Sequence, residues 1–309
     1  MRSLTTEYHS GKEGLAVISR VLRVAPRKLV WQVARRYIAG PTLVDAVATI
    51  RSLNDVGFTT AVSYLGEHAT TLTDCDQALH MYQEVLELIR TLRLRASLSV
   101  KPSQLGLKLH YHAFLDRAGA LLAQAESLGT FVRWDMEDAS CTHCTLEAYR
   151  ALQRRYPNTG VVLQASLRRS LEDARRLSAT PANVRVCKGA YREPADIAHH
   201  RREAIRQGYV QILRILLRAG CFVGIATHDA VLISAAKRLI EMYRVPPTQY
   251  EFEVLLGVRP ERAQRLLADG HPVLVYVPFG QQWFEYSTRR FDENPQLLWT
   301  IARATLLGR

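Results

Sequence analysis

Eight short runs of apolar and β-branched residues alternate with amphipathic stretches along this chain. The runs occupy residues 58–66, 96–102, 130–136, 160–166, 184–189, 221–228, 250–257 and 271–278. Each interval between them has room for one helix and two loops, and alternating strands and helices predict a parallel sheet. Eight such units in about 250 residues match a (β/α)8 TIM-like barrel. A doubly wound open sheet is the alternative, but no G-x-G-x-x-G motif follows the first run.

The chain before the first run has a helical periodicity instead. The stretches "LAVISRVLRVA" and "PTLVDAVATIRSL" carry apolar residues at spacings of three and four. We therefore expect an N-terminal helical segment at residues 1–57 that packs on a barrel at residues 58–309. The N-terminus has no apolar signal region, and no apolar run approaches the roughly 20 residues that span a bilayer. A cytoplasmic protein is expected.

The chain is basic, with a formal net charge of +12 at pH 7. Such a charge fits an ordinary basic surface, or a surface that meets an anionic partner such as a nucleic acid or a membrane. The basic residues are spread along the sequence without a block of five. This spread argues against a nucleic-acid-binding tail, so no nucleic-acid partner is expected.

The five cysteines predict neither a disulfide framework nor a metal site. Their number is odd and their spacing irregular, unlike the cysteines of small secreted domains. Cys141 and Cys144 form a C-x-x-C pair, but no second ligand pair accompanies it, as a zinc site would require. We expect two small residues at a helix start there.

Polar residues stand where six of the eight predicted strands end. They are Glu67, Lys101, Asp135, Gln164, Lys188, His228 and, within strands, Arg185 and Tyr276. In a (β/α)8 barrel these ends converge on the face that carries active sites. Arg185 alternates with Val184 and Val186, which points its charge toward the barrel interior, where it needs an anion or a carboxylate. The pattern predicts a site for a charged or highly polar ligand.

A further cluster is predicted in "EYSTRRFDENP" (285–295). If this segment is helical, the side chains of Tyr286, Arg289, Arg290 and Glu293 share one face through spacings of three and four. The face is either a solvated ladder of ion pairs or a cradle for a carboxylate. The spacing alone leaves both open.

Taken together, these segments resemble the proline dehydrogenase family. The matching stretches are "VKPSQLGL" (100–107), "VRWDMED" (132–138), "VVLQASLRRS" (161–170), "VRVCKGAYREP" (184–194), "ATHD" (226–229), "EFEVLLGVRPE" (251–261), "VYVPFG" (275–280) and "YSTRRFDENP" (286–295). The resemblance implies FAD as the cofactor. It implies oxidation of L-proline to 1-pyrroline-5-carboxylate by hydride transfer to flavin N5, with electrons passed to a quinone.

The resemblance also implies roles for individual residues. Arg289 and Arg290 would bind the substrate carboxylate, and Glu67 could pair with Arg289 over the bound substrate. The remaining substrate-binding residues would be Lys101, Tyr276 and Tyr286. Asp135 and Arg185 would be catalytic, with Arg185 near flavin N5. The FAD-binding residues would be Met136, Gln164, Arg185, Lys188, Gly189, Ala190, Thr227, His228 and Glu293.

Some positions depart from the family pattern. Ser63 stands where the family usually has Asp, Leu256 where an aromatic or His is usual, and residues 198–203 replace a Pro-containing segment; Pro102 after Lys101 is also unexpected. Two alternatives therefore stay open: a paralogue that oxidises another cyclic amino acid such as hydroxyproline, and a catalytically silent ligand-binding barrel. The expected partners are L-proline, a quinone, a membrane surface and pyrroline-5-carboxylate dehydrogenase.

Overall fold

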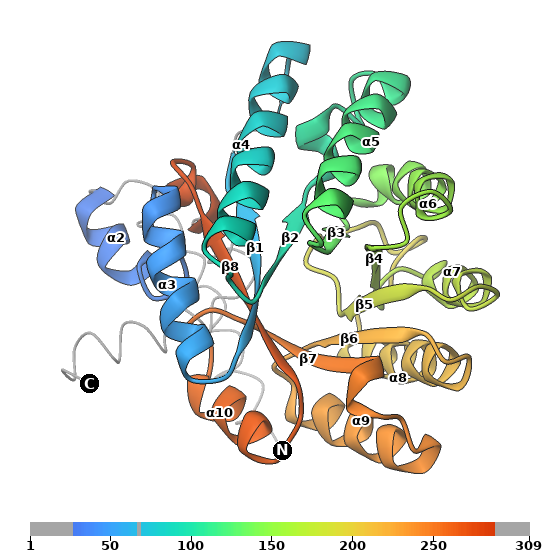
Figure 1. Ribbon diagram of the computed structural model, residues 1–309. Coiled ribbons are helices and arrows are strands. Elements are labelled where there is room, and N and C mark those ends of the chain that lie inside the picture. The colour runs from blue at the N-terminus through green and yellow to red at the C-terminus, as the bar shows by residue number, and fades with distance from the viewer. Residues whose placement is uncertain (1–26, 67–68, 288–309) are drawn as a thin grey trace, which may run out of the picture.

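The computed structural model describes residues 27–66 and 69–287. Its strands form a closed barrel in which each strand is parallel to both neighbours, in the order of the sequence (Figure 1). The strands are β1 (Thr59–Tyr64), β2 (Ala96–Val100), β3 (Val132–Trp134), β4 (Thr159–Gln164), β5 (Asn183–Cys187), β6 (Phe222–Ala226), β7 (Tyr250–Leu255) and β8 (Val273–Phe279). Each lies within or at the edge of one predicted run, so the barrel prediction is confirmed and the open sheet is excluded.

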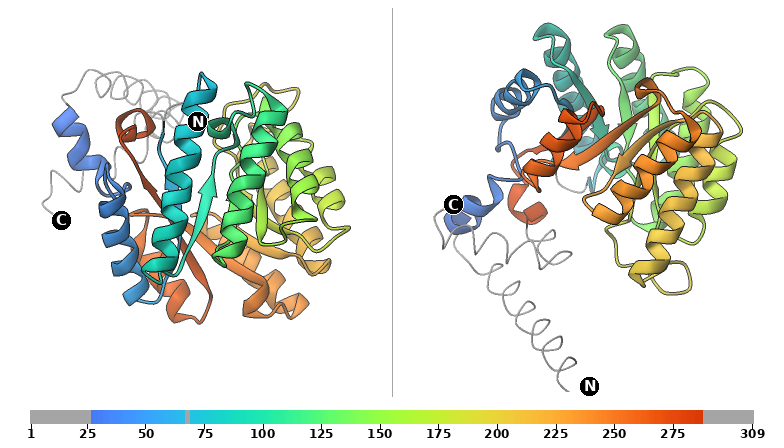
Figure 2. Two further views of the ribbon diagram at one scale, coloured as in Figure 1. Left: turned by 45° about the horizontal axis from the view of Figure 1, so that its top comes forward. Right: turned by 90° about the horizontal axis from the view of Figure 1, so that it is seen from below.

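Helices surround the barrel (Figures 1 and 2). They are α2 (Arg27–Ala34), α3 (Leu43–Asp55), α4 (Leu72–Thr91), α5 (Tyr111–Ser127), α6 (Ala139–Gln153), α7 (Ser170–Leu177), α8 (Arg202–Arg218), α9 (Ala230–Tyr243) and α10 (Pro260–Ala268), with short 3-10 helices η1 (Pro102–Leu105) and η2 (Pro247–Gln249). Pro102 opens η1, a position where proline needs no amide hydrogen. No helix in the described part of the chain is long and apolar enough to cross a membrane.

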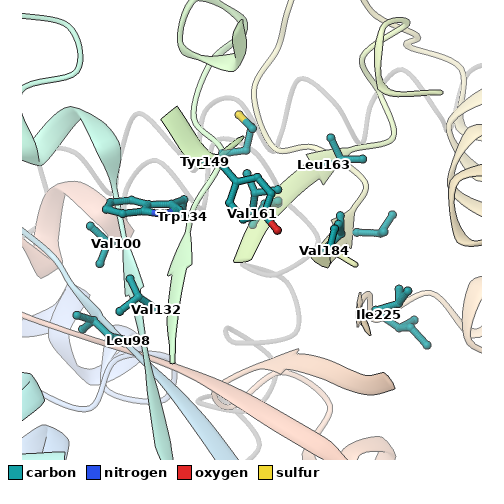
Figure 3. Packing of buried hydrophobic residues seen from close by; sticks show 14 of the residues in the cluster. Leu98, Val100, Val132, Trp134, Tyr149, Val161, Leu163, Val184 and Ile225 are labelled. Carbon is teal, nitrogen blue, oxygen red and sulfur yellow. The ribbon is translucent and has the colours of Figure 1, made fainter. Parts of the chain in front are cut away.

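Alternation along the strands separates two environments. Apolar side chains such as Leu98, Trp134 and Val161 pack outward in a buried layer against the helices (Figure 3). Trp134 meets Phe114 of α5 edge to face, with ring centroids 6.0 Å apart. The residues between them, such as Ser99 and Arg185, point into the barrel interior because successive strand side chains face opposite ways.

Two polar residues at strand ends also begin helices. The Asp138 side chain accepts a hydrogen bond from the Ser140 amide at the start of α6, and Asp229 accepts from the Val231 amide at the start of α9. These caps fix the backbone that leaves β3 and β6. The polar rim of the barrel is thereby held in a defined geometry.

The described N-terminal segment lies beside the barrel seam, where β1 pairs with β8 over six residue pairs. Helix α3 packs against both strands, and the Ala39 amide donates to the Pro278 carbonyl at 2.9 Å. Gly257, at φ +71°, faces the Arg36 carbonyl, where an added Cβ would lie only 1.8 Å from the oxygen. The backbone of this segment thus sits directly on the loop after β7.

Candidate active site

A hydrogen-bonded network joins three strands and the residue that follows β3 at the carboxyl-terminal end of the barrel. Arg185 Nη1 donates to Asp135 Oδ1 at 2.9 Å and to Ser99 Oγ at 3.1 Å. Ser99 also donates to Asp135 Oδ1 at 2.7 Å, and the Tyr276 hydroxyl donates to Oδ2 at 2.9 Å. The Arg185 guanidinium carbon lies 5.6 Å from the centre of the Tyr276 ring. The Asp135 carboxylate is therefore held on both oxygens.

The network continues to Lys101 through Ser63. Lys101 Nζ donates to Ser63 Oγ at 3.0 Å, and Ser63 Oγ lies 2.7 Å from the Tyr276 hydroxyl oxygen. Because Tyr276 gives its one proton to Asp135, the Ser63 hydroxyl donates to Tyr276. Burial raises the pKa of Tyr276 well above its usual value, so the phenol stays protonated. Ser63, a departure from the family pattern, thus connects a cation to the central carboxylate.

Below this network, the barrel interior holds further charges. Glu253 of β7 forms a close ion pair with Arg185 Nε, and its other oxygen lies 3.8 Å from Arg133 Nη2. Arg133 Nη2 also lies 3.9 Å from Glu251. Burial alone would lower the pKa of Arg185. The Glu253 and Asp135 carboxylates outweigh burial and hold that pKa above its usual value. Burial and the neighbouring Glu253 raise the pKa of Glu251 to about 7.

A second cluster surrounds Asp229, which follows β6. Lys188 Nζ donates to Asp229 at 2.8 Å, and Arg206 donates to both of its oxygens at 2.9 Å. Arg202 is 3.8 Å away. Burial alone would raise the pKa of Asp229. The hydrogen bonds from Arg206 and Lys188 outweigh burial and hold that pKa far below its usual value. One carboxylate thus gathers three cations, a donor set suited to an anionic group.

His228 stands beside this cluster with one nitrogen unsatisfied. Its Nε2 accepts a hydrogen bond from the Leu255 amide at 3.1 Å, so the neutral ring carries its proton on Nδ1. That Nδ1 is buried and has no hydrogen-bond partner within the described residues. A buried donor without a partner is costly, which suits a ligand that supplies an acceptor.

Burial, followed by the charges of Arg259 and Arg262, lowers the pKa of His228 to about 4. The unfolded chain binds a proton near pH 6.5, so stability that is present above pH 6.5 is lost as the pH falls toward 4. From this group we expect a loss of about 2 kcal/mol between pH 7 and pH 5. Urea unfolding at both pH values measures it. The loss should be absent in His228→Gln, and an equal loss in that variant would contradict this origin.

The other predicted cofactor residues lie along the same rim. Gln164 is buried and donates from Nε2 to the Glu137 carbonyl at 2.9 Å. Met136 and Thr227 are buried at the ends of β3 and β6, whereas Ala190 is exposed. Gly189 has a φ of +103°, and a Cβ there would lie 2.1 Å from Ser166 Oγ.

Several predicted residues lie outside the described part of the chain: Glu67, Arg289, Arg290 and Glu293. Tyr286 is buried in a small cluster with Ala34, Ile38 and Leu65. Cys141 and Cys144 are free thiols in the first turns of α6, and burial raises the pKa of Cys141 to about 11. Within residues 27–66 and 69–287 no group of three His, Cys, Asp or Glu side chains is arranged to hold a metal.

Sequence reasoning missed several residues of these clusters, among them Ser99, Arg133, Glu253 and Arg206. Glu251 and Glu253 alternate with apolar residues in "YEFEVLL", and Arg133 does so in "TFVRWDM". In a closed barrel such alternation places a charge inside rather than in solvent. That signal was present for Glu253 and Arg133, whereas Ser99 carries none.

Comparisons with known proteins give the family. A model of the family "Proline dehydrogenase" matches residues 46–299. "Proline dehydrogenase 1" of Bacillus subtilis (strain 168) is 35% identical over 262 residues, covering 85% of this chain and 87% of that protein. "Proline dehydrogenase" of Deinococcus radiodurans is 30% identical over 287 residues, covering 91% of this chain and 93% of that protein.

A solved structure shares the fold. Proline utilization A (PutA) from Bdellovibrio bacteriovorus, inactivated by N-propargylglycine, superposes with a TM-score of 0.83 at 22% identity over 87% of this chain. The chain spans about a third of the length of that protein (33%). The family match covers most of the sequence and includes every strand of the barrel, from β1 to β8. The chain belongs to the proline dehydrogenase family of oxidoreductases.

Proposed function

We propose that the chain catalyses the FAD-dependent oxidation of L-proline to 1-pyrroline-5-carboxylate. The observation that carries this proposal is the network of Arg185, Asp135 and Tyr276 at the carboxyl-terminal end of the barrel, where barrels of this kind hold their substrates. The proposal also rests on membership of the family and on the division expected from the sequence, a helical segment at 1–57 on a catalytic barrel at 58–309.

Cationic and aromatic side chains would hold the substrate. Arg289 and Arg290 would grip its carboxylate in bidentate fashion, and Lys101 would add a third positive charge. Tyr276 and Tyr286 would enclose the ring. Lys101 is held by Ser63 at 3.0 Å, which supports its placement at this end of the barrel.

The residues of the rim fit FAD. The unpartnered Nδ1 of His228 offers a buried donor, and Lys188 offers a cation beside it. The other residues that would hold the cofactor are Met136, Gln164, Arg185, Gly189, Ala190, Thr227 and Glu293. When bound, FAD would accept the hydride and pass both electrons to a quinone.

The chain's own contribution would be orientation and charge. Asp135 would fix Arg185 and Tyr276, and Arg185 would offer positive charge where negative charge develops in the reaction. Nearby cations lower the pKa of the substrate amine, which must lose its proton before hydride leaves. Because Asp135 already accepts three hydrogen bonds, solvent would take that proton.

Two partners follow from this reaction. A quinone lives in the bilayer, so peripheral contact of the basic surface with an anionic membrane is part of the proposal; co-sedimentation with anionic vesicles tests it. The product is the substrate of pyrroline-5-carboxylate dehydrogenase, for which we propose docking.

An absorbance spectrum before and after anaerobic addition of L-proline tests the function. Flavin bands that bleach on proline support it. Bands that persist with proline but bleach with hydroxyproline would favour the paralogue. A colourless protein that takes up no FAD would favour the silent barrel, and either of these results would overturn the proposal.

A further inference from the structure

Charges of alternating sign run from the rim of the barrel into its interior. Asp135 contacts Arg185, Arg185 contacts Glu253, Glu253 lies near Arg133, and Arg133 lies near Glu251. Arg133 and Glu253 are almost fully buried, with 2% and 4% of their side chains exposed. Charges this deep persist only with close partners of opposite sign. Glu253 is the member that stands between two arginines.

The barrel makes room for this carboxylate at one glycine. A Cβ on Gly224, in the neighbouring strand β6, would lie 1.9 Å from Glu253 Oε1. The carboxylate therefore occupies the space that a side chain at position 224 would fill. The oxygen over Gly224, Oε1, is the one near Arg133, and the other oxygen, Oε2, pairs with Arg185.

The Arg185 guanidinium is consequently held along two edges. Its Nε lies in a close ion pair with Glu253 that does not have hydrogen-bond geometry, while Nη1 donates hydrogen bonds to Asp135 and Ser99. A planar group held on two edges keeps one orientation. Loss of either carboxylate would free it to turn and would leave its positive charge less balanced.

We propose that Glu253 is a positioning residue, which holds Arg185 from the barrel interior and offsets the charge that Arg185 presents at the rim. This inference rests on the proposed function for its catalytic meaning. The contact between Glu253 and Arg185 Nε, by contrast, is present in the chain without cofactor. Glu253 itself touches neither substrate nor cofactor in this assignment.

The first experiment uses the protein without FAD. The Arg185 Nε–H signal, assigned with Arg185→Lys, is followed by NMR hydrogen exchange. In Glu253→Gln exchange should be at least tenfold faster than in the parent. Glu251→Gln is the matched control, because Glu251 lies on the same strand and face but pairs with Arg133; its exchange should change less than threefold. Equal exchange in the parent and Glu253→Gln would overturn the proposal.

The second experiment measures the midpoint potential of bound FAD by chemical reduction, without proline. Removing the Glu253 charge leaves Arg185 less balanced, which favours the reduced flavin. We expect at least a tenfold shift of the two-electron equilibrium, about 30 mV upward, with Glu253→Asp close to the parent. A lower melting temperature with an unchanged potential would mean that Glu253 is merely structural and would overturn the proposal.

If Glu253→Gln does not fold, Gly224→Ala takes its place, since it keeps the charge but displaces the carboxylate. It should speed Nε–H exchange at Arg185, and unchanged exchange would overturn the proposal. The two proposals fail separately. A protein whose FAD is not bleached by proline but whose potential shifts in Glu253→Gln would refute the function and retain the positioning role.

Discussion

Replacing Arg185 with methionine is expected to lower the free energy of unfolding by about 3–5 kcal/mol. The change keeps a similar shape but leaves the Glu253 and Asp135 carboxylates in the barrel without the cation that both contact. Removing one partner of a buried ion pair costs far more than the pair contributes, because the remaining charge stays desolvated. Urea unfolding of the variant without FAD measures this loss.

The same variant should oxidise proline with a kcat/KM lowered about 100-fold or more, since a fixed positive charge near the reacting atoms is lost. Arg185→Lys is the matched control. It keeps the charge but cannot bridge Asp135 and Glu253 at once, so it should recover part of the stability and little of the rate. If the free energy of unfolding of Arg185→Met lay within about 1 kcal/mol of the parent value, the buried carboxylates would not need this guanidinium for stability.

Replacing Gly257 with alanine is also expected to have a large effect and to lower the free energy of unfolding by about 3 kcal/mol. The φ of +71° disfavours a side chain there, and the new Cβ would overlap the Arg36 carbonyl oxygen. Because backbone rather than a flexible side chain is in the way, the segment from α2 to α3 must shift. Limited proteolysis should therefore cut near residue 36 faster than in the parent.

Gly270→Ala separates the effect of the positive φ from that of the overlap with the Arg36 carbonyl. Gly270 has a similar φ of +83°, but no atom lies within 4 Å of the added Cβ. This control should cost about 1 kcal/mol and leave proteolysis near residue 36 unchanged. If both variants lose the same stability, the contact between Gly257 and Arg36 contributes nothing.

The barrel was predictable because each strand is a short run with an apolar outward face. "VRVCKG" and "CFVGIATH" show this clearly: their valines and isoleucines pack on the helices, whatever the opposite face carries. The shortest strand, β3, spans only Val132–Trp134, and its predicted run of seven residues was too long. Asp135 directly follows the strand, and its amide still donates to the Val100 carbonyl at 2.8 Å. Its side chain therefore faces the barrel interior, as that of Arg133 does, and contacts Arg185.

The site was less predictable, for physical reasons. The sequence pattern predicts that Arg185 lies in the barrel interior and needs an anionic partner. Asp135 and Glu253 each supply a carboxylate. The sequence does not say which carboxylates these are, because the choice depends on the register between strands distant along the chain. Ser63 and Ser99 are small hydroxyls with no pattern of their own, and only closure of the barrel brings them to Tyr276 and Asp135.

The seam between β1 and β8 has a consequence for the synthesis of the chain. Thr59 pairs with Leu274 and Tyr64 with Phe279, so β1 must wait for about 215 further residues before its second neighbour exists. At typical translation rates this wait lasts roughly 10 to 40 s. Throughout it one edge of a nascent, apolar sheet stands open to pairing with other chains. Ring closure is then a late and slow event in folding, and the unfinished sheet is exposed to aggregation during that interval.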